Sequence, residues 1–343
     1  TLSLPVCEIQ LKAHAVSCAV QKVSGDDPDI TNKILIFAEV SYIYNSSNII
    51  NDTAAVKPQM IVDGGVGIGR ITKKGLARPV GAAAINPVPL KMIEAALKET
   101  AEAFGYEGGL QAVISAPQGV EIAKKTYNPQ LGIPGGISIL GTSGIVEPMS
   151  EQALIDTIRT EMKMHLADGE QTLLITPGNY GQDFLHETLK IELKRSIKCS
   201  NFIGDTIDMG CELGAKGMLF VGHIGKLVKL GAGIMNTHSK MADGRMEILA
   251  ACAVRAGACS ETVRNILDCV TTDAALELLK NEKILGKTME QLMLRIDACL
   301  QKRGGDNMQI GAVVFSNEFG LLGKTEQADE LLLKITADVS SEK

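Results

Sequence analysis

Aromatic residues are scarce in this chain of 343 residues: they make up 3% of the sequence, and Trp does not occur. Proteins that bind single-stranded nucleic acid stack bases on exposed rings, so the sequence disfavours that function. The core has to be built from Leu, Ile, Val, Ala and Met. The hydrophobic share of 45% and the charged share of 22% are those of an ordinary globular protein, and the length suggests two domains.

An excess of positive charge is also lacking. The chain has 34 basic and 40 acidic residues, a net charge of −6, which gives no bulk attraction to nucleic acid. Apolar runs of 18 residues do not occur, so we expect no membrane span. We therefore expect neither nucleic acid nor a membrane as partner, and a homo-oligomer stays open.

The eight cysteines contain no Cys-x-x-Cys pair, which disfavours a zinc ribbon or a thioredoxin-like site. Their even spread in a chain of this length favours reduced thiols and a cytoplasmic protein. The sequence begins with Thr1 rather than Met, so a missing start of the natural protein is compatible with it.

The first part of the chain is rich in strand patterns. We predict strands within residues 6–44 and at 111–116, and a helix over 87–104 that stops at Gly105. From residue 137 strands alternate with helices: strands at 137–140, 172–176, 198–202, 217–221 and 309–315, helices at 151–167, 184–195 and one ending near Gly214. This alternation predicts an α/β fold with a parallel sheet.

Four loops follow the predicted parallel strands, at residues 141–148, 177–183, 203–208 and 222–226. The carboxyl ends of parallel strands share one edge of a sheet, so we expect these loops to converge where ligands bind. The segment 176–181 (TPGNYG) fits two interpretations equally: a plain strand-to-helix turn, or a small-molecule site with Asn179 and Tyr180 as polar groups.

The segment 222–245 holds two histidines, His223 and His238, followed by Asp243. The histidines are 15 residues apart, which is no local metal spacing, so we predict no metal here. His238 could act as a base, as an orienting donor or as a satisfied polar residue. Lys226 and Lys229 share one helix face, and the plain interpretation of that spacing is a solvated face.

The glycine-rich run 62–69 (VDGGVGIG) resembles a dinucleotide fingerprint, but the required helix does not follow it. A glycine-rich hairpin or covering loop fits better. Next come four cations, Arg70, Lys73, Lys74 and Arg78, which are either solvated or able to bind a polycarboxylate in a cleft.

Several long runs, in order along the chain, resemble the CbiD family of cobalt-precorrin-5B C-1 methyltransferases. They are residues 25–31, 67–76, 84–89, 128–150, 176–184, 199–205 and 222–245. The sequence departs from the family at Lys74, where proline is common, at Ser143, where threonine is common, and by beginning after the family's Thr-Thr-Gly segment.

The resemblance implies methyl transfer from S-adenosylmethionine to C-1 of a cobalt corrinoid, with no protein-bound metal. It also implies an α+β domain, placed at residues 1–136, and a Rossmann-like α/β domain at 137–343, unlike the common class I methyltransferase fold. The cofactor residues we expect are Gly141, Thr142, Thr176, Gly178, Asn179, Tyr180 and Asp205.

The substrate is a macrocycle with many carboxylates, and its expected contacts are Arg70, Lys73, Lys74, His223, Lys226 and Asn236. His238 and Asp243 are the expected catalytic residues, as orienting or proton-accepting groups. Two other functions stay open: an NAD(P)-dependent oxidoreductase of the same pathway, which the misplaced glycine motif disfavours, and a non-catalytic corrinoid carrier.

Overall fold

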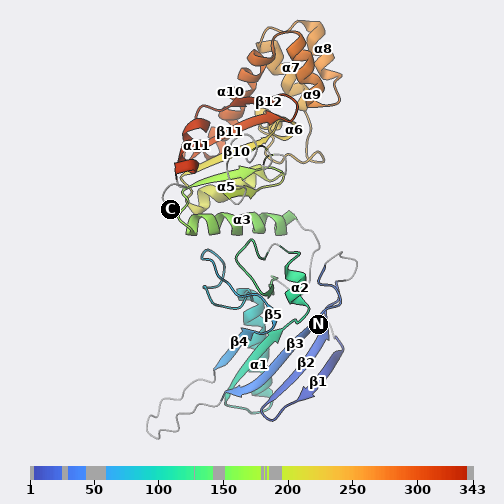
Figure 1. The fold of residues 1–343 in the computed structure, drawn as a ribbon, viewed down its shortest axis with the longest axis vertical. Helices are drawn as coiled ribbons and strands as arrows, with labels where there is room; N and C mark the ends of the chain where they lie inside the picture. Colours follow the sequence, from blue (N-terminus) through green and yellow to red (C-terminus); the bar gives the residue numbers. More distant parts are fainter. Residues whose placement is uncertain are drawn as a thin grey trace. The chain divides into compact units, whose positions relative to one another are not determined.

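The protein is described here by a computed structural model, which covers residues 4–24, 30–43, 59–126, 128–141, 151–178, 181, 184 and 195–337. Its contacts divide the chain into two compact units, Thr1–Ser150 and Glu151–Lys343 (Figure 1). The sequence placed this division after residue 136. Both units combine helices and strands, so the predicted α/β class holds.

Unit 1 is built on a five-stranded sheet. Its strands, in spatial order, are β1 (Val6–Leu11), β2 (Ala15–Gln21), β3 (Leu35–Ile43), β6 (Gly109–Ser115) and β4 (Met60–Gly64). Neighbouring strands run antiparallel except β4 and β6, which are parallel. The predicted strands within 6–44 and at 111–116 are therefore confirmed.

Helix α1 (Pro87–Ala103) covers part of one face of this sheet. Proline in its first turn suits the helix start, and the backbone leaves the helix at Phe104 and Gly105, where φ is +63°. Its buried residues Leu97 and Ala101 pack on Leu110 and Ala112 of β6. Both ends agree closely with the helix predicted over residues 87–104.

The glycine-rich run forms a tight packing of backbone against backbone. Strand β5 (Gly67–Ile68) pairs in parallel with β7 (Gly136–Ile137), next to the short helix α2 (Gly119–Ala123). A Cβ atom on Gly67 would lie 1.7 Å from the carbonyl oxygen of Ala116, so only glycine fits there. No helix opens directly after residue 69, and the dinucleotide interpretation is excluded in favour of structural glycines.

This pairing also corrects a prediction. Residues 137–140 were expected to form the first strand of the parallel sheet, but Ile137 pairs with Ile68 inside unit 1. A four-residue apolar run shows that a strand is buried without showing which strand lies beside it.

Unit 2 contains the mainly parallel sheet. Its strands, in spatial order, are β12 (Gly320–Lys324), β11 (Gln309–Ser316), β10 (Gly217–His223), β8 (Thr172–Thr176) and β9 (Ser196–Lys198). All neighbours are parallel except β11 and β12. The strand predicted at 198–202 instead ends at Lys198, because a turn and a helix begin there.

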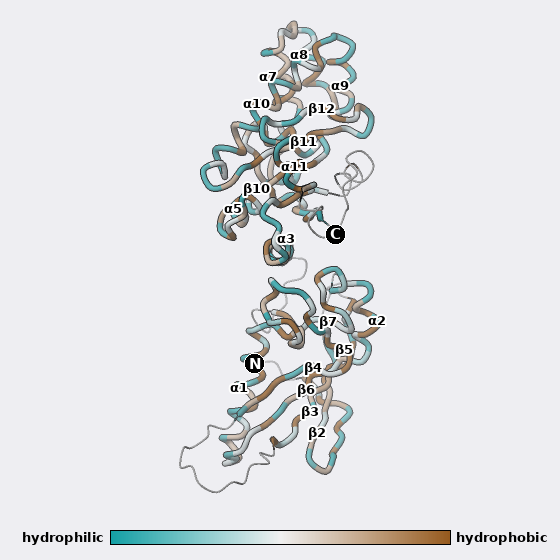
Figure 2. Tube along the Cα trace, turned by 60° about the vertical axis from the view of Figure 1, so that its left-hand side comes forward, coloured by the Kyte–Doolittle hydropathy of each residue, from teal (hydrophilic) through white to brown (hydrophobic). Residues whose placement is uncertain are grey.

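The described helices of unit 2 are α3 (Glu151–Ala167), α5 (Ile203–Leu213), α6 (Ile224–Leu227), α7 (Arg245–Arg255), α8 (Ser260–Leu267), α9 (Thr272–Asn281), α10 (Leu285–Gly304) and α11 (Ala328–Ala337), together with the 3-10 turn η2 (Val228–Ala232). Figure 2 shows brown and teal alternating along α7–α10, as expected for helices with one buried face. The predicted helix 184–195 lies almost entirely outside the described residues.

The strands of unit 2 are apolar on both faces because helices cover both faces. On one face Leu219 and Val221 of β10 pack with Leu331 of α11. On the other face Met218 and Phe220 belong to the large core that includes residues of α3, α5, α7 and α10. Among the described residues, no helix is long and apolar enough to cross a membrane.

Candidate functional site

The sheet of unit 2 reverses its strand order between β8 and β10. Counted along the chain from β8, the spatial order is 2-1-3-4-5, so the connection from β8 leaves to one side and the later strands extend to the other. Such a switch point leaves a crevice at the carboxyl ends of the two strands, where ligands of open α/β sheets bind. In this chain it lies at Thr176–Gly178 and His223.

The two strand ends approach closely because Gly222 has no side chain. A Cβ atom there would lie 2.9 Å from the ring of Pro177 and 3.0 Å from Leu227. Any larger residue at position 222 would push the Thr176–Gly178 turn away from β10. This glycine therefore allows the close approach of the two strand ends.

Lys226 joins three of the strand-end segments. Its half-buried side chain donates through Nζ to the carbonyl oxygen of Pro177 (2.5 Å) and to that of Ser200 (3.3 Å). Burial lowers the pKa of this ammonium, and no carboxylate lies within 4 Å of it in the part of the chain that the structure describes. The predicted substrate contact is thus also a structural link between the ends of β8, β9 and β10.

Two buried side chains lie beneath this link. Burial raises the pKa of the Cys199 thiol to about 12, so the residue is an inert neutral thiol at neutral pH. The hydroxyl of Thr176 is fully buried and has no hydrogen-bond partner within the described ranges. This hydroxyl therefore has hydrogen-bonding capacity that the described part of the chain does not use.

His223 is the last residue of β10 and caps helix α6. Its Nδ1 accepts the backbone N–H of Gly225 at 3.1 Å, so the neutral ring carries its proton on Nε2. The ring packs edge-on against Phe315, with centroids 5.7 Å apart. Burial lowers its pKa, partly opposed by the Asp273 carboxylate, so His223 is a neutral donor at pH 7.

The segment 236–243 is fixed to the end of β9. Asn236 forms an isolated antiparallel β-bridge with Phe202. Thr237 donates two hydrogen bonds to Asn201: its N–H to the backbone carbonyl (3.0 Å) and its hydroxyl to the side-chain oxygen (3.2 Å). Sequence reasoning missed Asn201, because its role depends on a loop that follows it by more than thirty residues.

Lys229 was predicted on a solvated face, and this prediction is wrong. The residue is 3% exposed, and its Nζ donates to the carbonyl oxygens of Thr237 (3.1 Å) and Ala242 (2.7 Å). It too lacks a carboxylate partner in the described ranges. The spacing of Lys226 and Lys229 is the same on a solvent-exposed helix face and on a face covered by a loop. The sequence therefore contains no indication that Lys229 is buried.

The two expected catalytic residues are both exposed, at the ends of the same loop. His238 Nδ1 accepts the backbone N–H of Lys240 at 3.1 Å. Asp243 forms a two-pronged ion pair with Arg245, at 2.7 and 3.0 Å, and this hydrogen bonding holds the pKa of Asp243 below its usual range. A carboxylate with a lowered pKa is a weak base, which favours an orienting role over proton acceptance.

The predicted cations of unit 1 differ from one another. Arg70 forms a bidentate pair with Asp63 (2.7 and 2.9 Å) and also donates to the carbonyl of Gly64 at 2.5 Å. Each partner shifts the other's pKa: Arg70 lowers that of Asp63, and Asp63 raises that of Arg70. Lys73 and Lys74, by contrast, are exposed.

The expected cofactor residues are divided between the units. Thr176 and Gly178 lie at the switch point, and Asp205 lies in the first turn of α5, after β9. Gly141 belongs to unit 1, so the loop after residue 140 does not follow a strand of the parallel sheet as predicted. Thr142, Asn179 and Tyr180 lie outside the described residues.

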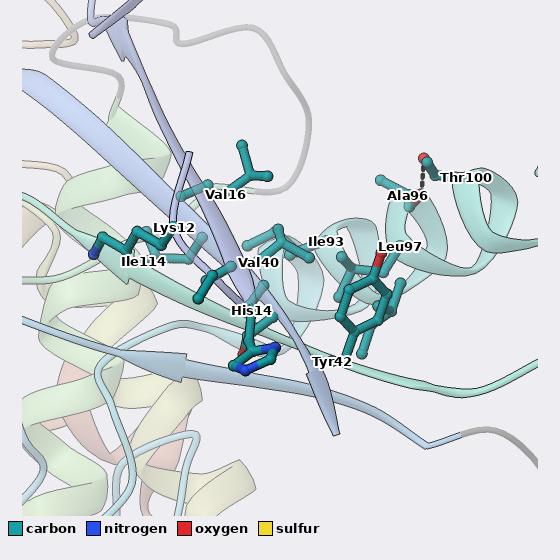
Figure 3. Close-up of a pocket in the computed structure, with 16 residues that line it drawn as sticks. Lys12, His14, Val16, Val40, Tyr42, Ile93, Ala96, Leu97, Thr100 and Ile114 are labelled. Atoms are coloured by element: carbon teal, nitrogen blue, oxygen red, sulfur yellow. Dashed lines mark hydrogen bonds between the residues drawn. The ribbon is translucent and has the colours of Figure 1, made fainter. Parts of the chain in front are cut away.

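Unit 1 also contains a cavity of about 600 Å³ that holds none of the predicted site residues (Figure 3). It lies between α1 and the strands β2, β3 and β6. Two of its lining residues, Ala38 and Ala112, have small side chains that leave this space open. His14 and Tyr42 are among its few polar groups. Its lining comes from many short segments, so no local motif could have revealed it.

Within the ranges described, no three His, Cys, Asp or Glu side chains are grouped as a metal site. His223 and His238 in particular have separate backbone partners.

Two family models match this chain: CbiD over residues 1–148 and the CbiD C-terminal domain over residues 236–326. The chain belongs to the CbiD family. It is 45% identical to the cobalt-precorrin-5B C(1)-methyltransferase of Ruminiclostridium cellulolyticum, over 92% of this chain and 79% of that protein. The family resemblance seen in the sequence is thereby confirmed.

Other members are also similar over most of their length. The protein of the same name from Alkaliphilus metalliredigens is 44% identical over 97% of this chain and 84% of its own length, and that from Clostridioides difficile is 37% identical over 96% and 86%. A crystal structure of the cobalamin biosynthesis protein cbiD from Archaeoglobus fulgidus covers 68% of both chains at 25% identity, with a TM-score of 0.31.

Proposed function

We propose that this CbiD member transfers a methyl group from S-adenosylmethionine to C-1 of cobalt-precorrin-5B, giving cobalt-precorrin-6A. The observation that carries the proposal is Lys226, a half-buried ammonium at the ends of β8, β9 and β10 that donates to backbone carbonyls in the described part of the chain. Because no carboxylate neutralises it there, this region suits an acidic ligand, and the macrocycle carries many carboxylates.

The Thr176–Gly178 turn is the proposed floor of the S-adenosylmethionine site, with Asn179 and Tyr180 beside it. Asp205 follows the second strand of the sheet, the position from which a carboxylate binds ribose hydroxyls in Rossmann-like folds. The strand order and its reversal support a Rossmann-like domain. Gly141 and Thr142 were assigned to the cofactor because they follow a predicted strand of the parallel sheet; since that strand belongs to unit 1, their assignment stays a prediction without this support.

Methyl transfer is an in-line displacement: C-1 forms a bond to the methyl carbon while the sulfur–carbon bond breaks and its electrons return to sulfur. The protein's contribution is alignment, which can lower such a barrier by roughly 7–11 kcal/mol in favourable cases. The ammonium of Lys226 and the Nε2–H of His223 are proposed to hold substrate carboxylates, with Asn236 presenting its side-chain amide.

His238 and Asp243 are proposed to orient the macrocycle. The Nδ1 atom of His238 already accepts a backbone N–H, so its Nε2 is the atom that can contact substrate. Asp243 is held by Arg245 and contributes through that fixed pair. In unit 1 the exposed Lys73 and Lys74 are proposed carboxylate contacts, whereas Arg70 supports the loop that carries them.

The test uses purified cobalt-precorrin-5B and S-adenosylmethionine labelled in its methyl group. The expected result is label in the corrinoid and equimolar S-adenosylhomocysteine. Tight pigment binding without label would indicate the corrinoid carrier instead. A product that forms only with NAD(P) would indicate the oxidoreductase.

The cofactor assignment has its own test. Replacing both Asn179 and Tyr180 by Ala should weaken S-adenosylmethionine binding in calorimetry while corrinoid binding persists. Equal affinity for the donor in both proteins would remove the Thr176–Gly178 turn from the proposed cofactor site.

A further inference from the structure

Lys229 lies in η2 between two apolar, fully buried residues. Its neighbours Val228 and Leu230 are 0% exposed, and Lys229 itself is 3% exposed. Placing an ammonium in such surroundings costs free energy that an apolar side chain of the same length would not cost. A structural role in the core alone would be filled better by methionine or leucine.

The ammonium is directed at the loop that carries His238. It donates to Thr237 and to Ala242, the residues on either side of the exposed segment 238–241. One side chain therefore binds both ends of this loop, which we call the 237–242 loop. Thr237 is held from a second side by Asn201, whereas the Ala242 carbonyl is reached from η2 through Lys229.

We propose that Lys229 is a positioning residue, which clamps the 237–242 loop in the conformation that presents His238 to the corrinoid. The clamp itself is argued from the contacts above; that the loop meets the corrinoid rests on the proposed function. The charge also reaches the neighbouring groups, since it adds to the lowering of the pKa of Asp243 and of Lys226.

The experiment compares Lys229→Met with the wild type, without ligand, by hydrogen–deuterium exchange read at peptide resolution. The Met variant keeps the stem and removes the donors, leaving two carbonyls without their partner. In the wild type, the amides of Met241 and Ala242 donate to the His238 carbonyl. In the variant, exchange in the peptide that contains them should rise roughly 10- to 100-fold and should stay unchanged in β10 and α10.

Thr288→Val is the matched control. Thr288 is also fully buried in unit 2 and donates to the Ile284 carbonyl, but it lies on α10. Lys229→Arg, which keeps charge and donors, should restore part of the loop protection. If Lys229→Met does not fold, Lys229→Gln takes its place, since its polar side chain lacks the charge and is too short to bridge two carbonyls as lysine does.

Unchanged exchange of the 237–242 loop in the Met variant would overturn the clamp. So would a rise spread evenly over unit 2, which is the pattern that loss of a buried hydrogen bond in Thr288→Val would give. Equal loop exchange in the Arg and Met variants would also overturn it. Steady-state kinetics then tests its purpose: the KM for the corrinoid should rise roughly 10-fold, and the KM for S-adenosylmethionine should not. The two proposals can also fail separately. If Lys229→Met releases the loop but the wild-type protein transfers no methyl group, the proposed clamp stands and the proposed function is refuted.

Discussion

The predicted cations of unit 1 and the two lysines that follow β10 in unit 2 hold their charges in opposite ways. In unit 1, Arg70 is paired with Asp63, and Lys73 and Lys74 are exposed to water. In unit 2, Lys226 is half-buried and Lys229 is buried, and within the described ranges both ammonium groups donate to backbone carbonyls. Charges in water are screened and interact weakly, whereas partly buried charges act strongly at short range.

The difference suggests a division of labour under the proposed function. The exposed Lys73 and Lys74 are suited to attract an acidic ligand in a salt-dependent way, while Lys226 and Lys229 fix loops of unit 2. A buried cation that is bonded to backbone carbonyls cannot move to follow a ligand, so it selects a geometry. The following predictions test this contrast.

The largest effect is expected for Lys226→Met. Loss of the links to Pro177 and Ser200 frees the strand-end loops and removes a charge, so kcat/KM for labelled methyl transfer should fall roughly 100-fold. Lys302→Met, on the exposed last turn of α10, is the matched control and should retain wild-type turnover. A Lys226→Met variant within about threefold of that control would remove the proposed role.

Arg70→Met should act on stability. It removes the donor to the buried carbonyl of Gly64 and the ion-pair partner of Asp63, so the free energy of unfolding should fall by about 1 kcal/mol. Lys74→Met, which removes an exposed cation, should leave the melting temperature unchanged. Equal melting temperatures of all three proteins in a thermal scan would contradict the supporting role of Arg70.

Replacing both Lys73 and Lys74 by Ser should have a smaller, salt-dependent effect. We expect the KM for the corrinoid to rise roughly 3- to 10-fold at low ionic strength and to approach the wild-type value at high salt, because exposed charges are screened. A Lys91→Ser, Lys98→Ser variant removes the same charge from α1 as a control. An effect that persists at high salt would place these lysines in a buried contact.

The smallest effect concerns pH. Burial lowers the pKa of His223 below its unfolded value of about 6.5, so the unfolded chain binds the extra proton first. The contribution of neutral His223 to the free energy of unfolding is therefore fully present above the unfolded-state pKa, and it is lost as the pH falls below that value toward the lower pKa of the folded state. His223→Gln should therefore flatten the dependence of the melting temperature on pH between about 7.5 and 5.5. An identical slope in both proteins would refute the assignment.

Much of the fold could be predicted because local patterns were strong. Helix α3 and strand β8 have the predicted bounds, and α1 differs by one residue at its end. The two helices show apolar residues at helical spacing, and β8 is a short apolar run that ends at a Pro-Gly turn. The short strand at Ile137 was assigned to the wrong sheet, since pairing depends on residues far away in the chain.

The candidate site was predicted in part. The segments around Thr176 and His223 do meet at the carboxyl ends of neighbouring strands, as parallel topology required. The loop after residue 140 does not belong to this edge. Lys229 and Asn201 were missed because each acquires its role from two hydrogen bonds to the 237–242 loop, whose position the local sequence pattern does not give.

The sequence by itself determined the family, the strand and helix periods and the residue types available at the strand ends. Only the tertiary structure decided which of the lysines carry their charge in water and which carry it inside. The reason is physical: a lysine has the same chemistry in every sequence, and its surroundings, set by contacts between distant segments, decide how strongly its charge acts. In this protein that difference separates Lys73 and Lys74 from Lys226 and Lys229.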